Sequence, residues 1–196
     1  VQEMINIGRL AKRAIEKDVQ VMIEGPGHVP LNEVTANVTL AKSLIGDVPY
    51  YVLGPLVTDI ASGHDHIASA IGAAVSASAG VDLLCYLTPS EHLALPTPEE
   101  VKEGLIAYRI AAHAGDLVKL RDKSIKWDLK MTEARRTLDW DAQLALSIDP
   151  EKAAKIHGRT GQHPGNNVPC TMCGGACVYI MLPKQRKYAT EDKKLQ

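Results

Sequence analysis

The chain has 196 residues, of which 45% are hydrophobic and 23% charged, an ordinary balance for a globular protein. The formal net charge is −1, so no global positive field favours nucleic acid or an acidic membrane surface as a partner. No apolar run reaches the roughly 18 residues that suggest a transmembrane helix, and we expect no membrane partner either.

Helical and strand-like patterns alternate through the first 120 residues. Apolar side chains at helical spacing predict three helices: 3–17, 31–45 and 65–79. Short apolar runs predict three buried strands: 19–24, 49–53 and 81–87. A fourth helix is predicted to start with Thr97 as N-cap, Pro98 at the first helical position and Glu100 at the third, and to run to about residue 119.

This alternation predicts an α/β fold with parallel strands joined by helices. Three strands cannot close a barrel, and a parallel sheet of three strands would leave open edges. We therefore expect the C-terminal part of a (β/α)8 TIM-type barrel, with a small doubly wound sheet as the alternative. The sequence begins without Met and in the pattern of an amphipathic helix, so we also expect it to be part of a longer protein.

The composition changes after residue 120, where charged residues become frequent. Helices are predicted over 125–147 and 150–157, the second opened by Asp149-Pro150. Gly, Asn and Pro then predict a flexible linker over 158–169, and a solvated tail is predicted from Arg186. The expected organisation has three parts: a barrel portion over 1–120, a helical segment over 121–158, and a cysteine-cluster arm with linker and tail over 159–196.

Three of the four cysteines lie within eight residues, as Cys170-Thr-Met-Cys173-Gly-Gly-Ala-Cys177. Such clustering favours a metal or cluster site in a reducing compartment, here the cytoplasm, over a disulfide framework. Thiolates select iron–sulfur clusters, zinc or copper, and three thiolates on a four-iron cluster leave one iron free to bind a small molecule. The alternatives are a zinc site that takes His163 as its fourth ligand, or a cysteine turn without metal.

Polar residues follow two of the predicted strands at the ends where a (β/α) barrel carries its functional groups. Glu24 and His28 follow the first strand, and His92 follows the third. Each histidine alone is more often structural, but two imidazoles on one rim can share zinc or iron.

Three other residues have a simpler interpretation. His64 and His66 lie at the start of the helix predicted over 65–79, where capping and solvent exposure are expected. Cys85 lies inside a predicted strand and is expected to be a buried, inert thiol.

Five motifs occur in an order that resembles the phosphomethylpyrimidine synthase family of thiamine biosynthesis, together with its anaerobic relatives, the 5-hydroxybenzimidazole synthases. The resemblance extends from about Val19 to Val178. The motifs are VMIEGPGHVP (21–30), LGPLVTDIASGHDHI (53–67), LLCYLTPSEHLALP (83–96), AYRIAAHAGDL (107–117) and CTMCGGAC (170–177).

The resemblance implies a (β/α) barrel followed by a cluster-bearing segment. It also implies a role for each matching residue: a [4Fe-4S] cluster on Cys170, Cys173 and Cys177, zinc or another divalent metal on His28 and His92, and substrate contacts from Glu24 and Tyr51. Family members are homodimers in which one protomer's cluster segment is thought to serve the other's site, and they need an electron donor.

The implied reaction starts when the reduced cluster cleaves S-adenosylmethionine, and the resulting radical abstracts hydrogen from aminoimidazole ribotide. The product is 4-amino-5-hydroxymethyl-2-methylpyrimidine phosphate, with release of formate and carbon monoxide. The benzimidazole synthases use the same substrate, and the motifs do not separate the two. A non-catalytic zinc-binding or interaction domain is the alternative of another class.

Two features depart from the family pattern. The best-known members have four residues between the last two cysteines, whereas this chain has three. The front half of the family sequence, which supplies several substrate contacts, is absent from these 196 residues.

Overall fold

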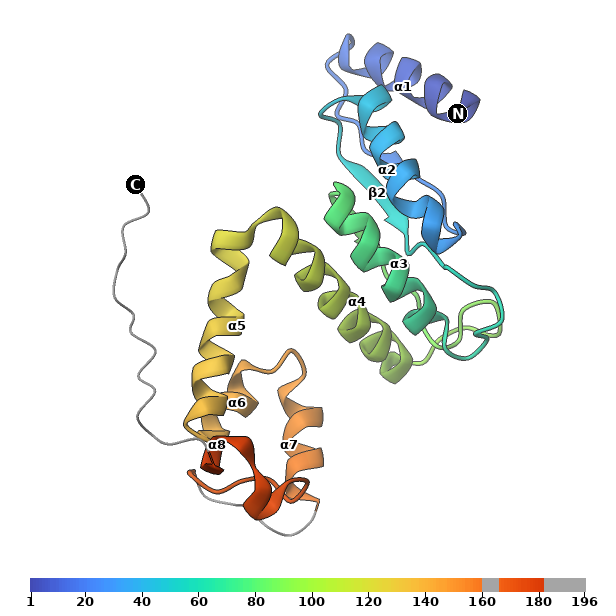
Figure 1. Ribbon diagram of the computed structural model, residues 1–196. Helices are drawn as coiled ribbons and strands as arrows, with labels where there is room; N and C mark the ends of the chain where they lie inside the picture. The colour runs from blue at the N-terminus through green and yellow to red at the C-terminus, as the bar shows by residue number, and fades with distance from the viewer. Residues whose placement is uncertain (160–165, 182–196) are drawn as a thin grey trace, which may run out of the picture. The chain divides into compact units, whose positions relative to one another are not determined.

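The computed structural model describes residues 1–159 and 166–181 of a mixed, helix-rich α/β chain that divides into two compact units, Val1–Ile125 and Lys126–Gln196 (Figure 1). The first unit contains, in chain order, α1 (Gln2–Ile15), β1 (Ile23–Glu24), α2 (Leu31–Ile45), β2 (Tyr50–Leu53), α3 (Asp65–Ala79), β3 (Leu83–Cys85) and α4 (Pro98–Lys119). Helix α5 (Arg121–Arg136) crosses the boundary, and the second unit continues with α6 (Trp140–Leu146), α7 (Pro150–Gly158), the 3₁₀-helix η1 (Gly174–Ala176) and α8 (Val178–Met181). Within both described ranges, every helix is too short or too polar to cross a membrane.

The three strands form one parallel sheet in the order β1-β2-β3, as the alternation of elements predicts. Glu24 of β1 lies opposite Tyr51 of β2, and Tyr51 in turn lies opposite Leu83 of β3. Since successive side chains of a strand point to opposite faces, this register places these three side chains in one row on one face.

The two faces of the sheet differ in burial. Ile23, Tyr50 and Val52 are buried in a core formed with helices α1 and α2, and α2 and α3 lie across one side of β2 in Figure 1. On the other face Leu83 is 46% exposed, and Met22, just before β1, is 56% exposed. The prediction of buried strands over 19–24 and 81–87 is therefore wrong for this second face, because the helices of this unit cover only the other face.

Helices α3 and α4 pack side by side (Figure 1) over the loops that follow β2 and β3. A Cβ added at Gly72 of α3 would lie 2.0 Å from the Pro55 carbonyl oxygen, and one added at Gly104 of α4 would lie 2.2 Å from that of Leu87. Real side chains never approach so closely. Glycine at these two positions thus lets both helices rest directly on the backbone of the strand-end loops.

The helical segment after α4 differs from the sequence prediction in its first helix. The helix predicted over 125–147 is interrupted after Arg136, where Leu138 adopts a left-handed backbone with φ of 53°. The Asp139 carboxylate then accepts a hydrogen bond from the Ala142 amide and starts α6. Asp149 caps α7 in the same way, as the Asp149-Pro150 pair predicts. The predicted tail and His163 lie outside the described residues.

Helix α4 begins with the predicted capping box. The Thr97 hydroxyl accepts a hydrogen bond from the Glu100 amide at 3.3 Å, and the Glu100 carboxylate accepts one from the Thr97 amide at 2.7 Å. We expect Thr97→Ala to lower the free energy of unfolding by about 1 kcal/mol, because the first turn loses its side-chain acceptor. Thr97→Ser keeps that acceptor and should retain most of the stability. Equal denaturation midpoints for the Ala and Ser variants in urea would show that the cap contributes nothing.

Candidate functional site

His28 and His92 come together at the C-terminal ends of the strands, as their positions in the sequence predict. Their ring centroids are 5.6 Å apart and the ring planes are inclined by 47°. His28 is placed by its backbone, since the segment after β1 forms a parallel bridge between His28 and Leu56. Both side chains are about half exposed, so the pair is accessible from solvent.

Each imidazole of the pair is bonded to a carboxylate through Nδ1. His28 Nδ1 lies 2.8 Å from Asp59 Oδ1, and His92 Nδ1 lies 3.1 Å from Asp65 Oδ2. A carboxylate acceptor favours the tautomer with the proton on Nδ1 and leaves Nε2 as a lone-pair donor. Carboxylate–histidine pairs of this kind orient metal ligands in proteins.

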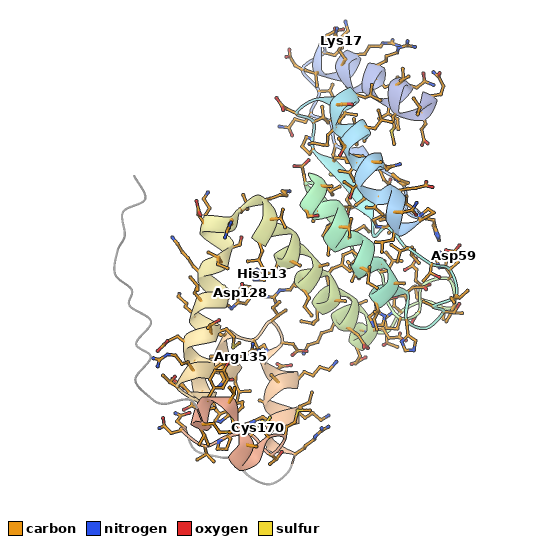
Figure 2. All side chains as sticks on the ribbon, in the orientation of Figure 1. Lys17, Asp59, His113, Asp128, Arg135 and Cys170 are labelled. Atoms are coloured by element: carbon orange, nitrogen blue, oxygen red, sulfur yellow. The ribbon has the colours of Figure 1, made fainter. Side chains whose placement is uncertain are left out.

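The two carboxylates differ in environment. Asp65 is in the first turn of α3 and its side chain is only 4% exposed, whereas that of Asp59 is 77% exposed. Figure 2 labels Asp59 in the loop between β2 and α3. An acidic residue in the first turn is favoured by the helix dipole, which helps to keep a buried carboxylate there. Neither carboxylate could be assigned a role from its position in the sequence, because only the folded chain brings Asp59 and Asp65 to the histidines.

The loop that carries His92 is held in an uncommon conformation. His92 has φ of +61°, a region that few residues other than glycine adopt and that tends to occur at functional sites. The Ser90 carbonyl oxygen accepts hydrogen bonds from the amides of Leu93 and Ala94 at 2.9 and 3.0 Å. Hydrogen bonds from the Ser90 hydroxyl and the Thr97 amide hold the pKa of Glu100 below its usual value, which ties this loop to the start of α4.

The histidine pair supplies two ligands and no more within residues 1–159 and 166–181. No group of three or more His, Cys, Asp or Glu side chains in those ranges is arranged to hold a metal ion. Each Nε2 atom nevertheless has a lone pair that can bind a divalent metal ion, as imidazole ligands do in zinc proteins.

Glu24, Tyr51 and Cys85 lie on the exposed face of the sheet, on three adjacent strands. The pKa of Tyr51 is raised to about 12, first by a hydrogen bond between its hydroxyl and the Cys85 side chain, then by burial and the nearby Cys85 and Glu24 charges. The phenol therefore stays protonated at any physiological pH. Cys85 is partly exposed, so the expectation that this thiol is buried is wrong.

His66 also differs from the sequence prediction. His64 is exposed as expected, but His66 is only 4% exposed, and its Nδ1 has no hydrogen-bond partner within the described part of the chain. Burial lowers the pKa of His66, although Glu103 at 3.6 Å opposes that shift. The packing of α3 against α4 buries this ring, and the position of His66 at a helix start could not reveal it.

The cysteine loop belongs to the second unit, where Figure 2 labels Cys170. Its backbone is coiled: the Cys170 carbonyl accepts from the Gly174 amide, and the Gly174 carbonyl accepts from the Cys177 amide, each at 3.2 Å. Gly174 has φ of +51°, and a Cβ added at either Gly174 or Gly175 would meet no atom of the described residues within 4 Å. The described part of the chain therefore leaves the glycine side of the loop open.

All three thiols of this loop are free, and they differ in exposure: Cys173 is exposed, Cys170 partly exposed and Cys177 buried. In number and chemistry they suit a four-iron cluster with one iron left open, but Cys177 must become exposed for all three to bind one group.

Comparisons with known proteins cover nearly the whole chain. The sequence model of the Radical SAM ThiC family matches residues 1–184. Phosphomethylpyrimidine synthase of Desulfitobacterium hafniense is 57% identical over 182 residues, which are 93% of this chain and 42% of that protein. The proteins of the same name from Ignicoccus hospitalis and Pelotomaculum thermopropionicum are 54% and 58% identical, over 98% and 91% of this chain and 43% and 41% of their own lengths. The chain thus spans about two fifths of the length of these relatives.

The bond between Tyr51 and Cys85 can be tested by titration. We expect Cys85→Ala to lower the pKa of Tyr51 from about 12 towards its ordinary value of 10, because the largest cause of the shift is removed. The measurement is tyrosinate absorbance against pH, with the Tyr51→Phe titration subtracted in each background. Cys85→Ser retains a hydrogen-bonding side chain but loses the charge that Cys85 contributes, and it should lower the pKa of Tyr51 part of the way. An unchanged pKa in the alanine variant would mean that the bond does not exist in solution.

Proposed function

The chain belongs to the Radical SAM ThiC family, and from this premise we propose that it forms part of a radical S-adenosylmethionine lyase that makes the pyrimidine of thiamine. The substrate is aminoimidazole ribotide and the product is 4-amino-5-hydroxymethyl-2-methylpyrimidine phosphate. The observation that carries the proposal is the loop with three free thiols at Cys170, Cys173 and Cys177, in a chain whose curated relatives are named phosphomethylpyrimidine synthase.

The alternatives are less well supported. A benzimidazole-forming enzyme would have the same cluster, but the relatives reported above, at 54–58% identity, bear the pyrimidine synthase name. A zinc-binding interaction domain would need a fourth ligand for the thiols, and membership of a radical enzyme family favours the cluster.

In this proposal Cys170, Cys173 and Cys177 bind a [4Fe-4S] cluster, which, when bound and reduced, supplies the electron that cleaves S-adenosylmethionine. The cysteines provide three thiolates and leave one iron without a protein ligand. The glycines between Cys173 and Cys177 leave space beside the loop for a bulky group. An electron donor is required, and a reducing compartment such as the cytoplasm keeps the thiols available.

Glu24 and Tyr51 bind the ribotide. They are opposite one another on β1 and β2, on the face of the sheet that helices do not cover in the first unit. The neutral phenol of Tyr51 can both donate and accept a hydrogen bond, and the carboxylate of Glu24 accepts from the amino or hydroxyl groups of the substrate. Glu24 and Tyr51 orient the ribotide, and the proposal gives neither of them a role as a general acid or base.

His28 and His92 bind zinc or another divalent metal through Nε2. The short distance between the rings and the carboxylate partner of each Nδ1 support this assignment. The remaining coordination positions are open to the polar groups of a bound small molecule.

The three-stranded sheet is proposed to be the C-terminal part of a (β/α)8 barrel. Its strands are parallel, and the proposed metal ligands His28 and His92 follow the C-terminal ends of β1 and β3, where barrel enzymes carry functional groups. The relatives are more than twice as long as the matched region, which leaves room for the other strands. In the homodimer of this proposal, the cysteine loop of one protomer serves the barrel of its partner.

The proposed reaction is tested in the full-length protein, purified and reconstituted without oxygen. With S-adenosylmethionine, aminoimidazole ribotide and a reductant, we expect 5′-deoxyadenosine and the hydroxymethylpyrimidine phosphate by mass spectrometry. Cys173→Ala should abolish 5′-deoxyadenosine formation because the cluster loses a ligand, whereas Cys85→Ala should keep the cluster iron of the wild type. A benzimidazole product would replace the proposed activity with the alternative, and stoichiometric zinc without iron would exclude both.

The histidine pair is tested by metal affinity in the same protein. We expect His92→Ala to abolish zinc binding at the barrel rim, and Asp65→Asn to weaken it about 10- to 100-fold, because the amide no longer orients the imidazole. His64→Ala removes an exposed histidine near the same helix start and should change nothing. Zinc competition with a coloured chelator measures each affinity. Equal losses in the His64 and His92 variants would count against the pair.

A further inference from the structure

The segment that leads into the cysteine loop is attached by three hydrogen bonds to helix α6 and by one to Leu138, just before that helix. Within this segment, Asn166 Oδ1 accepts from the Trp140 amide at 2.8 Å, and Asn166 Nδ2 donates to Asp141 Oδ2 at 3.1 Å. Trp140 Nε1 donates to the Val168 carbonyl at 2.8 Å, and the Asn167 amide donates to the Leu138 carbonyl at 3.0 Å. Asn166, Asn167 and Val168 lie in the stretch 158–169 that the sequence predicts as a flexible linker, of which 160–165 are outside the described residues.

Trp140 is the centre of this contact. The ring of His157, from α7, stacks on its indole with centroids 4.2 Å apart and planes inclined by 25°. The indole N–H then points to the Val168 carbonyl. One side chain thus joins α6, α7 and the segment before the cysteines.

The contact is close to the thiols along the chain. Pro169 separates Val168 from Cys170, and proline fixes its own φ and restricts the preceding residue to an extended backbone. The position of the Val168 carbonyl therefore sets the direction in which the chain enters the loop. Asn167, with φ of +74°, contributes the turn that brings Val168 to the indole.

We propose that Trp140 and Asn166 are positioning residues. They hold the start of the cysteine loop against α6 and α7, so that the three thiols keep a fixed position relative to these helices. The part of this inference that concerns the cluster rests on the proposed function of Cys170, Cys173 and Cys177. The attachment itself does not depend on that function, and it is tested in protein without the cluster.

The first measurement is the rate of thiol alkylation in the cluster-free, full-length protein, with each cysteine resolved by peptide mass spectrometry. Trp140→Phe keeps an aromatic ring against His157 but removes the indole donor to Val168, and Asn166→Ala removes two of the four bonds. We expect both variants to raise the alkylation rate of the buried Cys177 several-fold, while Cys85 in the first unit keeps its rate.

The matched control is Trp127→Phe. Trp127 belongs to the same unit and its Nε1 donates to the Leu146 carbonyl at 2.8 Å, a bond that does not reach the loop. This variant should leave Cys177 as protected as in the wild type. Unchanged protection in the Trp140 and Asn166 variants would overturn the proposal, and so would an equal loss in all three variants, which would indicate general loosening of the unit.

The second measurement separates positioning from folding in the reconstituted protein. Trp140→Phe should retain the iron content of the wild type but lower kcat for 5′-deoxyadenosine formation about tenfold with an unchanged KM for S-adenosylmethionine, since small misplacements of reacting groups slow catalysis. Wild-type kcat in this variant would overturn the positioning role. If the wild type binds no iron–sulfur cluster, the proposed function fails, whereas the alkylation result still decides whether the attachment exists.

Discussion

The parallel pairing of β2 with both of its neighbours determines where the proposed site residues of the first unit lie. Because β1 and β3 run in the same direction as β2, the segments that follow them emerge at one edge and bring His28 and His92 together. The same register sets Glu24 opposite Tyr51. A shift of one residue in either strand would turn these side chains to the helix-covered face.

The close approach of α3 and α4 to the strand-end loops maintains this arrangement. Gly72 and Gly104 allow the helices to touch backbone carbonyls directly, and α3 thereby brings the buried Asp65 within hydrogen-bonding distance of His92. The loop that carries His92 is tied at its other end to α4 through Ser90, Thr97 and Glu100. The imidazole of His92 is thus fixed by α3 and α4, two helices that begin far apart in the sequence.

The sequence predicted features that depend on neighbouring residues and missed those that depend on the folded chain. Thr97 and Asp149 were recognisable as caps because a capping residue and its helix are adjacent. The exposure of Leu83, the burial of His66 and the left-handed turn at Leu138 depend on which elements pack nearby, and no local pattern records that. Likewise the resemblance gave His28 and His92 a shared role, but their partners Asp59 and Asp65 became apparent only from distances.

The unequal surroundings of Asp59 and Asp65 make the histidine pair asymmetric towards dissolved ions. The carboxylate that binds His28 is open to water and to dissolved cations. The carboxylate that binds His92 is removed from solvent, so dissolved cations have little access to it. Water and cations therefore compete with the ring of His28 for its acidic partner, whereas the partner of His92 is shielded from them.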